Sequence, residues 1–182
     1  MDAGSTIKAE ENQSALSQVG AKKKFVLRRI VTILGGLALL LLVLFIANGT
    51  DKAWLSPRVG VNELVSPKHK ADQIRVLAFN IAKCSAFTGI TKFSTTKEVE
   101  ERLSRIADFI EKENIDLVFL SEVVNECVLC PVDQVEFLAR TGKFHAWASS
   151  DNYSFGLPFC RIRSGNAILS RYPLSSCKTM AL

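Results

Sequence analysis

Histidine is scarce in this chain of 182 residues, and its cysteines do not make a zinc pattern. The two histidines are His69 and His145, and one cysteine pair alone, Cys127 and Cys130, has the two-residue spacing of a zinc knuckle. A structural zinc site takes four ligands, so the lack of a second pair argues against zinc and favours structural or incidental thiols. The sequence also lacks an internal repeat, so we expect no stacked-repeat architecture.

Most of the chain lacks a strong net charge. The formal net charge is +5, but residues 1–29 carry six lysines and arginines against three acids and so supply +3 of it. Residues 30–182 hold 17 basic and 15 acidic side chains, a balance of only +2. A nearly neutral domain has no electrostatic surface for gripping a polyanion, which weakens a nuclease function without excluding one.

Charge is absent altogether from Ile30–Ala47, which reads IVTILGGLALLLLVLFIA. Its 18 residues are enough to cross a bilayer, and a helix buried in a soluble core would keep a polar stripe where this one has only Thr32. We therefore predict a transmembrane helix at 30–47, with the lipid bilayer as its partner. A cleaved signal is the alternative, because Ala47 and Gly49 suit a signal peptidase, but the long apolar core and the 29 residues before it favour a retained anchor.

Basic residues are distributed unequally on the two sides of this span. The other side has only Lys52 and Arg58 nearby, whereas the amino-terminal flank carries Lys22, Lys23, Lys24, Arg28 and Arg29. The positive-inside rule then predicts a single-pass membrane protein with a cytoplasmic amino terminus and an extracytoplasmic carboxy-terminal domain.

These patterns divide the chain into four parts. We expect a disordered, basic cytoplasmic tail at 1–29, the transmembrane helix at 30–47, a linker at 48–72 and a folded domain at 73–182. The domain's five cysteines would face an oxidising compartment, so one or two disulfides are expected. The odd count leaves at least one thiol unpaired.

Hydrophobic patterns at the start of the domain predict a strand, a helix and a second strand. The first strand is Ile74–Ala82; the helix begins after Thr95, which forms a capping box with the glutamate three residues on; and Ile115–Leu120 is apolar enough to be covered on both faces. Strands joined this way run parallel and end at the same edge of the sheet, where ligands bind. Asn80 and Glu122 stand at those ends, so we expect them to lie close together.

The rest of the domain gives weaker patterns. We expect a short helix at 131–140, with Pro131 in its first turn, and strands at 144–149 and 167–170. The stretch 150–156, which contains a glycosylation sequon at Asn152, has the composition of a loop.

Three separated stretches, IRVLAFNI, IDLVFLSEV and SGNAILSRYPL, resemble in their order and spacing the first three signatures of the endonuclease/exonuclease/phosphatase superfamily. This group contains pancreatic deoxyribonuclease, neutral sphingomyelinases and inositol polyphosphate 5-phosphatases. The resemblance covers residues 74–174. It implies an α/β (α+β) sandwich of that type, incomplete here and preceded by one transmembrane helix.

The resemblance also implies a metal site. The asparagine of the first signature, which helps to bind metal and phosphate in the family, matches Asn80, and the glutamate that is the principal Mg²⁺ ligand matches Glu122. The chemistry agrees, because Mg²⁺, or Mn²⁺ in its place, prefers oxygen ligands and is often held by one or two carboxylates, water and a substrate phosphate. Ser121 stands where the family often has glutamine, a change we interpret as tolerable.

Two later family signatures, a G-D-x-N segment and an S-D-H segment, do not occur in this sequence. They supply the aspartate that orients the attacking water and the histidines that contact the phosphate. His69 and His145 match neither context, and for His145 we expect a surface or structural role. The resemblance thus implies an amino-terminal portion of a larger enzyme, inactive alone and with one sheet face exposed.

The sequence leaves two functions open. The first is a membrane-anchored, Mg²⁺-dependent phosphoesterase, acting on a phospholipid or nucleic acid once completed, with Asn80 and Glu122 as catalytic and metal-binding residues. The second is a non-catalytic anchored binding domain that keeps the scaffold, in which Glu122 is a salt-bridged acid and Asn80 a turn residue. No protein partner is predicted.

Overall fold

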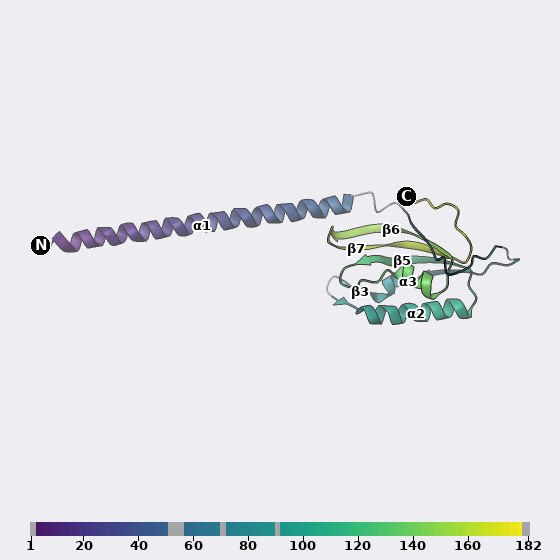
Figure 1. The fold of residues 1–182 in the computed structure, drawn as a ribbon. Helices are drawn as coiled ribbons and strands as arrows, with labels where there is room; N and C mark the ends of the chain where they lie inside the picture. Colours follow the sequence, from purple (N-terminus) through teal and green to yellow (C-terminus); the bar gives the residue numbers. More distant parts are fainter. Residues whose placement is uncertain (1–2, 51–56, 70–71, 90–91, 180–182) are drawn as a thin grey trace. The chain divides into compact units, whose positions relative to one another are not determined.

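The computed structural model describes residues 3–50, 57–69, 72–89 and 92–179 (Figure 1). The chain divides into two compact units, Met1–Leu44 and Phe45–Leu182. The first unit is helical and belongs to α1 (Ala3–Thr50). Within α1, Lys23–Asn48 is long and apolar enough, over its 26 residues, to cross a membrane. The helix is longer than predicted, because it includes the stretch expected to be a disordered tail, which is rich in the helix formers alanine, glutamate, glutamine and lysine.

The second unit is a mixed α/β fold built on a five-stranded sheet. Its strands lie in the order β1-β6-β7-β5-β2, and only the β2–β5 pair is parallel. The strands are β1 (Arg58–Val61), β2 (Val76–Asn80), β5 (Leu117–Cys127), β6 (Ala146–Leu157) and β7 (Cys160–Ser170). The other elements are the turn η2 (Ala82–Ser85), the short strands β3 (Phe87–Thr88) and β4 (Lys92–Phe93), and the helices α2 (Thr96–Lys112) and α3 (Gln134–Thr141).

Helix α2 begins where the sequence predicts. The Thr95 hydroxyl accepts a hydrogen bond from the Glu98 backbone N–H at 3.3 Å, and the Glu98 carboxylate accepts one from the Thr95 backbone N–H at 2.8 Å. This confirms the predicted capping box. The helix turns one apolar face to the core, formed by Val99, Leu103, Ala107 and Ile110. Fully burying each of the larger side chains stabilises the fold by about 1.5–3 kcal/mol.

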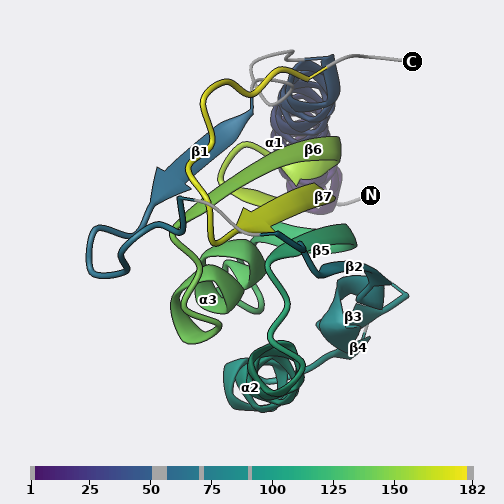
Figure 2. The ribbon, with the colours of Figure 1, turned by 90° about the vertical axis from the view of Figure 1, so that its right-hand side faces the viewer.

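The sheet has one covered face and one open face. Figure 2 shows α2 and α3 on the same side of the sheet. Along β5, Val118 and Leu120 are buried in the core beneath these helices, whereas Phe119 between them is 44% exposed. Successive strand residues point to opposite faces, so the other face carries Phe119. The prediction that this strand is covered on both faces is therefore wrong for the part of the chain that the structure describes.

Strands β6 and β7 form a long hairpin that the sequence does not predict. The stretch 150–156, expected to be a loop, lies in β6, and the linker contains β1, which pairs with β6 through Val59 and Ala148. The remaining linker residues 51–56 and 70–71 lie outside the described residues. The pairing of β6 with β7 shifts between Asp151 and Tyr153, and this bulge breaks the alternation by which a strand is recognised.

Two smaller predictions are also corrected. Helix α3 begins after Asp133, whose carboxylate accepts hydrogen bonds from the backbone N–H groups of Val135 and Glu136, rather than at Pro131. An N-cap side chain that binds these free N–H groups fixes the start of a helix more firmly than the preceding proline does. All five cysteines are free thiols, so the expected disulfides are not formed in the structure.

Candidate functional site

Glu122 lies in a bulge in the middle of β5, just past the end of the neighbouring strand β2. The register of β5 with β7 passes from the Ser121–Asn166 pair to the Val123–Gly165 pair, so Glu122 has no partner across the ladder. Its backbone φ of 56° is in the left-handed region, where a residue with a side chain is strained. A bulge of this kind redirects one side chain, and here it leaves the Glu122 side chain 45% exposed.

Asn80 lies beside Glu122, as the crossover between β2 and β5 predicts. Asn80 ends β2, and its side-chain Nδ2 donates a hydrogen bond to Glu122 Oε1 at 2.8 Å. Its Oδ1 accepts a hydrogen bond from the Ala82 backbone N–H at 2.7 Å. The predicted proximity of the two residues is confirmed. Asn80 also acts as a turn residue, since its amide group joins the start of η2 to the carboxylate.

A third residue of the site, Lys83, was missed by the sequence reasoning. Its Nζ lies 2.6 Å from Glu122 Oε2, and its side chain is only 25% exposed. The hydrogen bond from Lys83, then the hydrogen bond from Asn80, and then the charge of Lys83 lower the pKa of Glu122 below its ordinary value of 4.5. Glu122 is therefore ionised at neutral pH and held by donors on both oxygens.

The turn that presents Lys83 is strained. All four residues of η2, Ala82–Ser85, have φ values between 48° and 57°. A left-handed conformation costs roughly 1–2 kcal/mol for each residue that carries a Cβ, so the surrounding structure must hold the turn in place.

Gln134 supplies much of that hold. Its side chain is fully buried; Nε2 donates to the Lys83 carbonyl at 2.6 Å, and Oε1 accepts from the Val124 backbone N–H at 2.9 Å. One side chain thus connects the strained turn to the strand just past the Glu122 bulge. Arg102 adds a bond from its guanidinium to the Cys84 carbonyl at 3.2 Å.

Sequence offers little signal for these supporting residues. Lys83 follows Asn80 by three residues in a stretch without periodicity, and nothing in that stretch announces a left-handed turn. Gln134 is a polar residue at a buried position of a short helix, and only the backbone groups facing it explain why it is buried.

The oxygen atoms of Glu122 fit a hard cation that takes one carboxylate ligand from the protein. Each oxygen of Glu122 accepts one hydrogen bond, which leaves further lone pairs, and the carboxylate is open to water. Mg²⁺ is often held by one or two carboxylates together with water. Lys83 already places a positive charge on one oxygen, so an ion that binds there competes with the ammonium group.

Additional metal ligands do not gather around Glu122. Within the described ranges no three His, Cys, Asp or Glu side chains are close enough to hold a metal ion together. The Nδ1 atom of His145 lies 2.8 Å from the Val65 carbonyl. His145 comes just before the first residue of β6, away from Glu122. This agrees with the structural role expected for His145.

A groove on the open face of the sheet runs up to the residue before Glu122. A row of polar residues crosses four strands in register, from Asn80 through Ser121 and Asn166 to Ser150. The last three line a groove of about 640 Å³, whose other wall is the segment after β7. Thr179 in that segment donates a hydrogen bond to Ser150 at 2.9 Å. The groove offers room for a ligand beside Ser121, the residue before Glu122.

Comparisons of the chain with protein-family models, with curated proteins and with solved structures find no match. Membership of the endonuclease/exonuclease/phosphatase superfamily therefore stays a prediction that rests on the three sequence stretches.

Proposed function

We propose that the chain carries the first part of the active site of a membrane-anchored, Mg²⁺-dependent phosphoester hydrolase. The observation that supports this most directly is the pairing of Asn80 with Glu122. These residues are 42 positions apart, and a parallel crossover and a strained bulge bring them together at an exposed sheet edge. Strain of this kind is found where a side chain must be held in one orientation, as at a ligand site.

Each residue has a distinct role in this proposal. Glu122 binds Mg²⁺, or Mn²⁺, through its ionised carboxylate, and Asn80 keeps that carboxylate in one orientation. When bound, the ion neutralises the charge of a phosphoester and assists the attack of water. The substrate is a phospholipid or a nucleic acid; the nearly neutral charge of residues 30–182 and an anchor in the membrane favour the phospholipid.

Isothermal titration calorimetry of the detergent-solubilised, full-length protein with MgCl₂ tests the metal site. Replacing Glu122 by Gln is expected to weaken Mg²⁺ binding by about tenfold or more, because the carboxylate that binds the ion loses its charge. Glu111→Gln is the matched control, since Glu111 is also a surface glutamate paired with a lysine, Lys143. Equal Mg²⁺ affinity in the E122Q and wild-type proteins would remove Glu122 from the site.

A non-catalytic anchored domain is the second candidate. The Lys83–Glu122 ion pair favours it, because a lysine already neutralises the carboxylate and Asn80 already serves the adjacent turn. Hydrolysis of bis(4-nitrophenyl) phosphate separates the two functions when it is assayed with an extended protein that supplies the G-D-x-N and S-D-H segments. Mg²⁺-dependent hydrolysis that is lost in E122Q supports the enzyme, whereas hydrolysis that E122Q leaves unchanged, together with no Mg²⁺ binding, favours the binding domain.

A further inference from the structure

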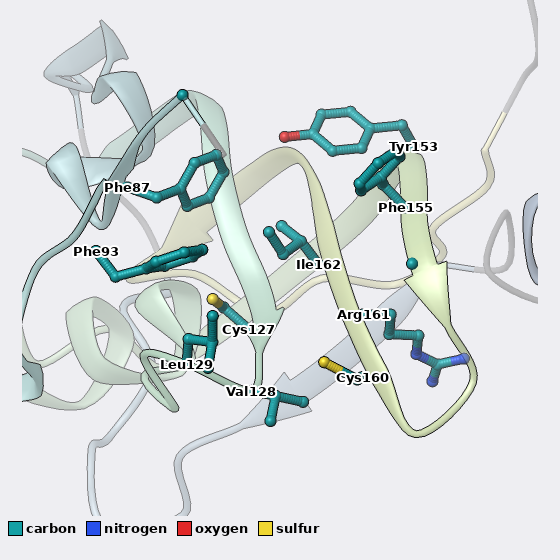
Figure 3. A pocket seen from close by; sticks show the side chains of 12 residues that line it. Phe87, Phe93, Cys127, Val128, Leu129, Tyr153, Phe155, Cys160, Arg161 and Ile162 are labelled. Atoms are coloured by element: carbon teal, nitrogen blue, oxygen red, sulfur yellow. The ribbon is translucent and has the colours of Figure 1, made fainter. Parts of the chain in front are cut away.

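A group of exposed apolar side chains lies around the outer end of the β6–β7 hairpin, and four of its five members line a pocket there. We name it the hairpin patch; its members, between 38% and 68% exposed, are Val128, Leu129, Tyr153, Phe155 and Phe159. The pocket has a volume of about 250 Å³, and Phe87, Phe93 and Ile162 form much of its wall (Figure 3). An exposed apolar group of this kind marks an interaction surface.

The hairpin projects beyond the rest of the sheet. The last residue of β5, Cys127, is opposite Ile162, which pairs with Phe155 on β6. The pairs farther out, Gly156–Arg161 and Leu157–Cys160, have no third strand beside them, and Pro158 and Phe159 make a two-residue turn. A short apolar tip held out by a rigid hairpin can enter another apolar medium without rearrangement of the fold.

The chemistry of the patch fits a lipid interface. No acidic residue lines the pocket, and its one charged residue, Arg161, points its guanidinium away from the aromatic rings (Figure 3) and pairs with Glu126 at 3.0 Å. Aromatic and aliphatic side chains are the composition of surfaces that settle at the boundary between headgroups and acyl chains.

The position of the patch in the second unit points to the same partner. Within the unit Phe45–Leu182, Asn48 Nδ2 donates hydrogen bonds to the Gly156 carbonyl at 3.0 Å and to Ser154 Oγ at 3.2 Å. The Phe45 ring lies edge-on to the Phe155 ring, with 5.4 Å between centroids. Phe45 and Asn48 also belong to the last four residues of the apolar span Lys23–Asn48. Two residues of that span therefore contact the β6–β7 hairpin within the second unit.

We propose that the hairpin patch inserts into the extracytoplasmic leaflet of the bilayer that holds the apolar span, so that the domain is fixed to the membrane at two places. The proposal rests on the predicted retention of that span in the membrane. It has a consequence for the candidate site: Cys127, in the pocket wall, is five residues from Glu122 along β5, or about 17 Å. Insertion of the patch would hold Glu122 within about 17 Å of the inserted side chains.

A fluorescent label at Cys160 tests the insertion in the full-length protein, reconstituted into phosphatidylcholine vesicles. Cys160 is exposed and lies at the hairpin tip. Cys177, which is half-buried, is removed by Cys177→Ser, and the other three cysteines are buried. We expect lipids that carry a nitroxide near the headgroup to quench a nitrobenzoxadiazole label at Cys160 about twofold or more. The matched control carries the label at Cys177 in a C160S protein, where aqueous iodide should quench instead.

Two further variants show whether the patch causes the insertion. Leu129→Asp combined with Phe159→Asp should reduce lipid quenching at Cys160 by about half or more, while Phe109→Asp, at a similarly exposed position of α2, should leave it unchanged. The insertion would be overturned if, in the protein with an intact hairpin patch, iodide quenches the label at Cys160 as strongly as the label at Cys177. Release of the protein from vesicles by alkaline carbonate would overturn the anchor as well, whatever the label reports.

Discussion

Two of the lysine–glutamate pairs on the surface of the second unit are held in different ways. Lys143 pairs with Glu111, which is on the regular helix α2, and both side chains are well exposed. Lys83 pairs with Glu122 between the left-handed turn η2 and the bulge of β5. At the first pair, one residue, Lys143, has a left-handed φ value. At the second pair, five residues have one: Glu122 and the four residues of η2. An ion pair alone does not require such strain, and this difference is what the proposal of a ligand site at Glu122 rests on.

The largest difference between the two regions is expected from Gln134, which supports only the Lys83–Glu122 pair. Replacing it by Leu removes one of the two hydrogen bonds to the Lys83 carbonyl, which also accepts from the Ala86 N–H at 2.9 Å, and removes the Gln134 acceptor of the buried Val124 N–H. We expect this to lower the free energy of unfolding by about 1–3 kcal/mol. Urea unfolding followed by near-ultraviolet circular dichroism measures it. Lys143→Met should leave the midpoint close to that of the wild type. Similar midpoints for both variants would contradict the supporting role of Gln134.

The two lysines should also differ in their effect on Mg²⁺. Lys83→Met removes the ammonium group that competes for Glu122, so we expect Mg²⁺ to bind about threefold to tenfold more tightly. Lys143→Met should not change the affinity, because Lys143 neutralises a different carboxylate. Calorimetric titration with MgCl₂ measures both. Weaker binding in K83M would mean that Lys83 assists the ion and does not compete with it.

Glycine substitutions distinguish strained backbone from regular backbone. Ser85→Gly should raise the free energy of unfolding by about 1 kcal/mol, because glycine adopts the left-handed conformation without a Cβ clash. Ser104→Gly, in the interior of α2, should lower it by about 0.5–1 kcal/mol, because glycine disfavours a helix. Thermal and urea unfolding provide the comparison. A loss of stability in S85G would show that the turn is not strained in solution.

The smallest effect is expected in the titration of the two carboxylates. Lys83→Met should raise the pKa of Glu122 towards its ordinary value and leave Glu111 unchanged, and Lys143→Met should do the reverse. Carboxyl carbon chemical shifts followed against pH report each group. Both pKa values are depressed in the folded protein, so the stability that ionisation contributes is present above the unfolded pKa and is lost as the pH falls through the folded pKa. Unchanged shifts at Glu122 in K83M would show that the ion pair does not form in solution.

The fold could be predicted from sequence where the signal is local or periodic. Thr95 caps α2 because its side chain binds a backbone N–H three residues on, an interaction that the sequence alone specifies. The parallel pairing of β2 with β5 follows from two apolar strands joined by a helix. The β6–β7 hairpin was missed because a bulge at Asn152 interrupts its alternation, and β1 because four residues give too short a pattern.

The candidate site was predicted only in the part that depends on local pattern or chain direction. The crossover places Asn80 and Glu122 at one edge, which is a matter of chain direction and strand length. Lys83 depends on a turn in which four residues adopt left-handed φ values, and local preferences oppose that conformation. Only tertiary contacts, above all those of the buried Gln134, can hold it.

The sequence by itself determined the apolar span, the capped helix, the parallel strand pair and the meeting of Asn80 with Glu122, because each depends on short-range pattern or on chain direction. The tertiary structure decided which face of the sheet stays open, that Lys83 reaches Glu122, and that the β6–β7 hairpin gathers apolar side chains at its tip. These features join residues distant in sequence through buried hydrogen bonds and packing, whose free energy exists only once the strands and helices are in place.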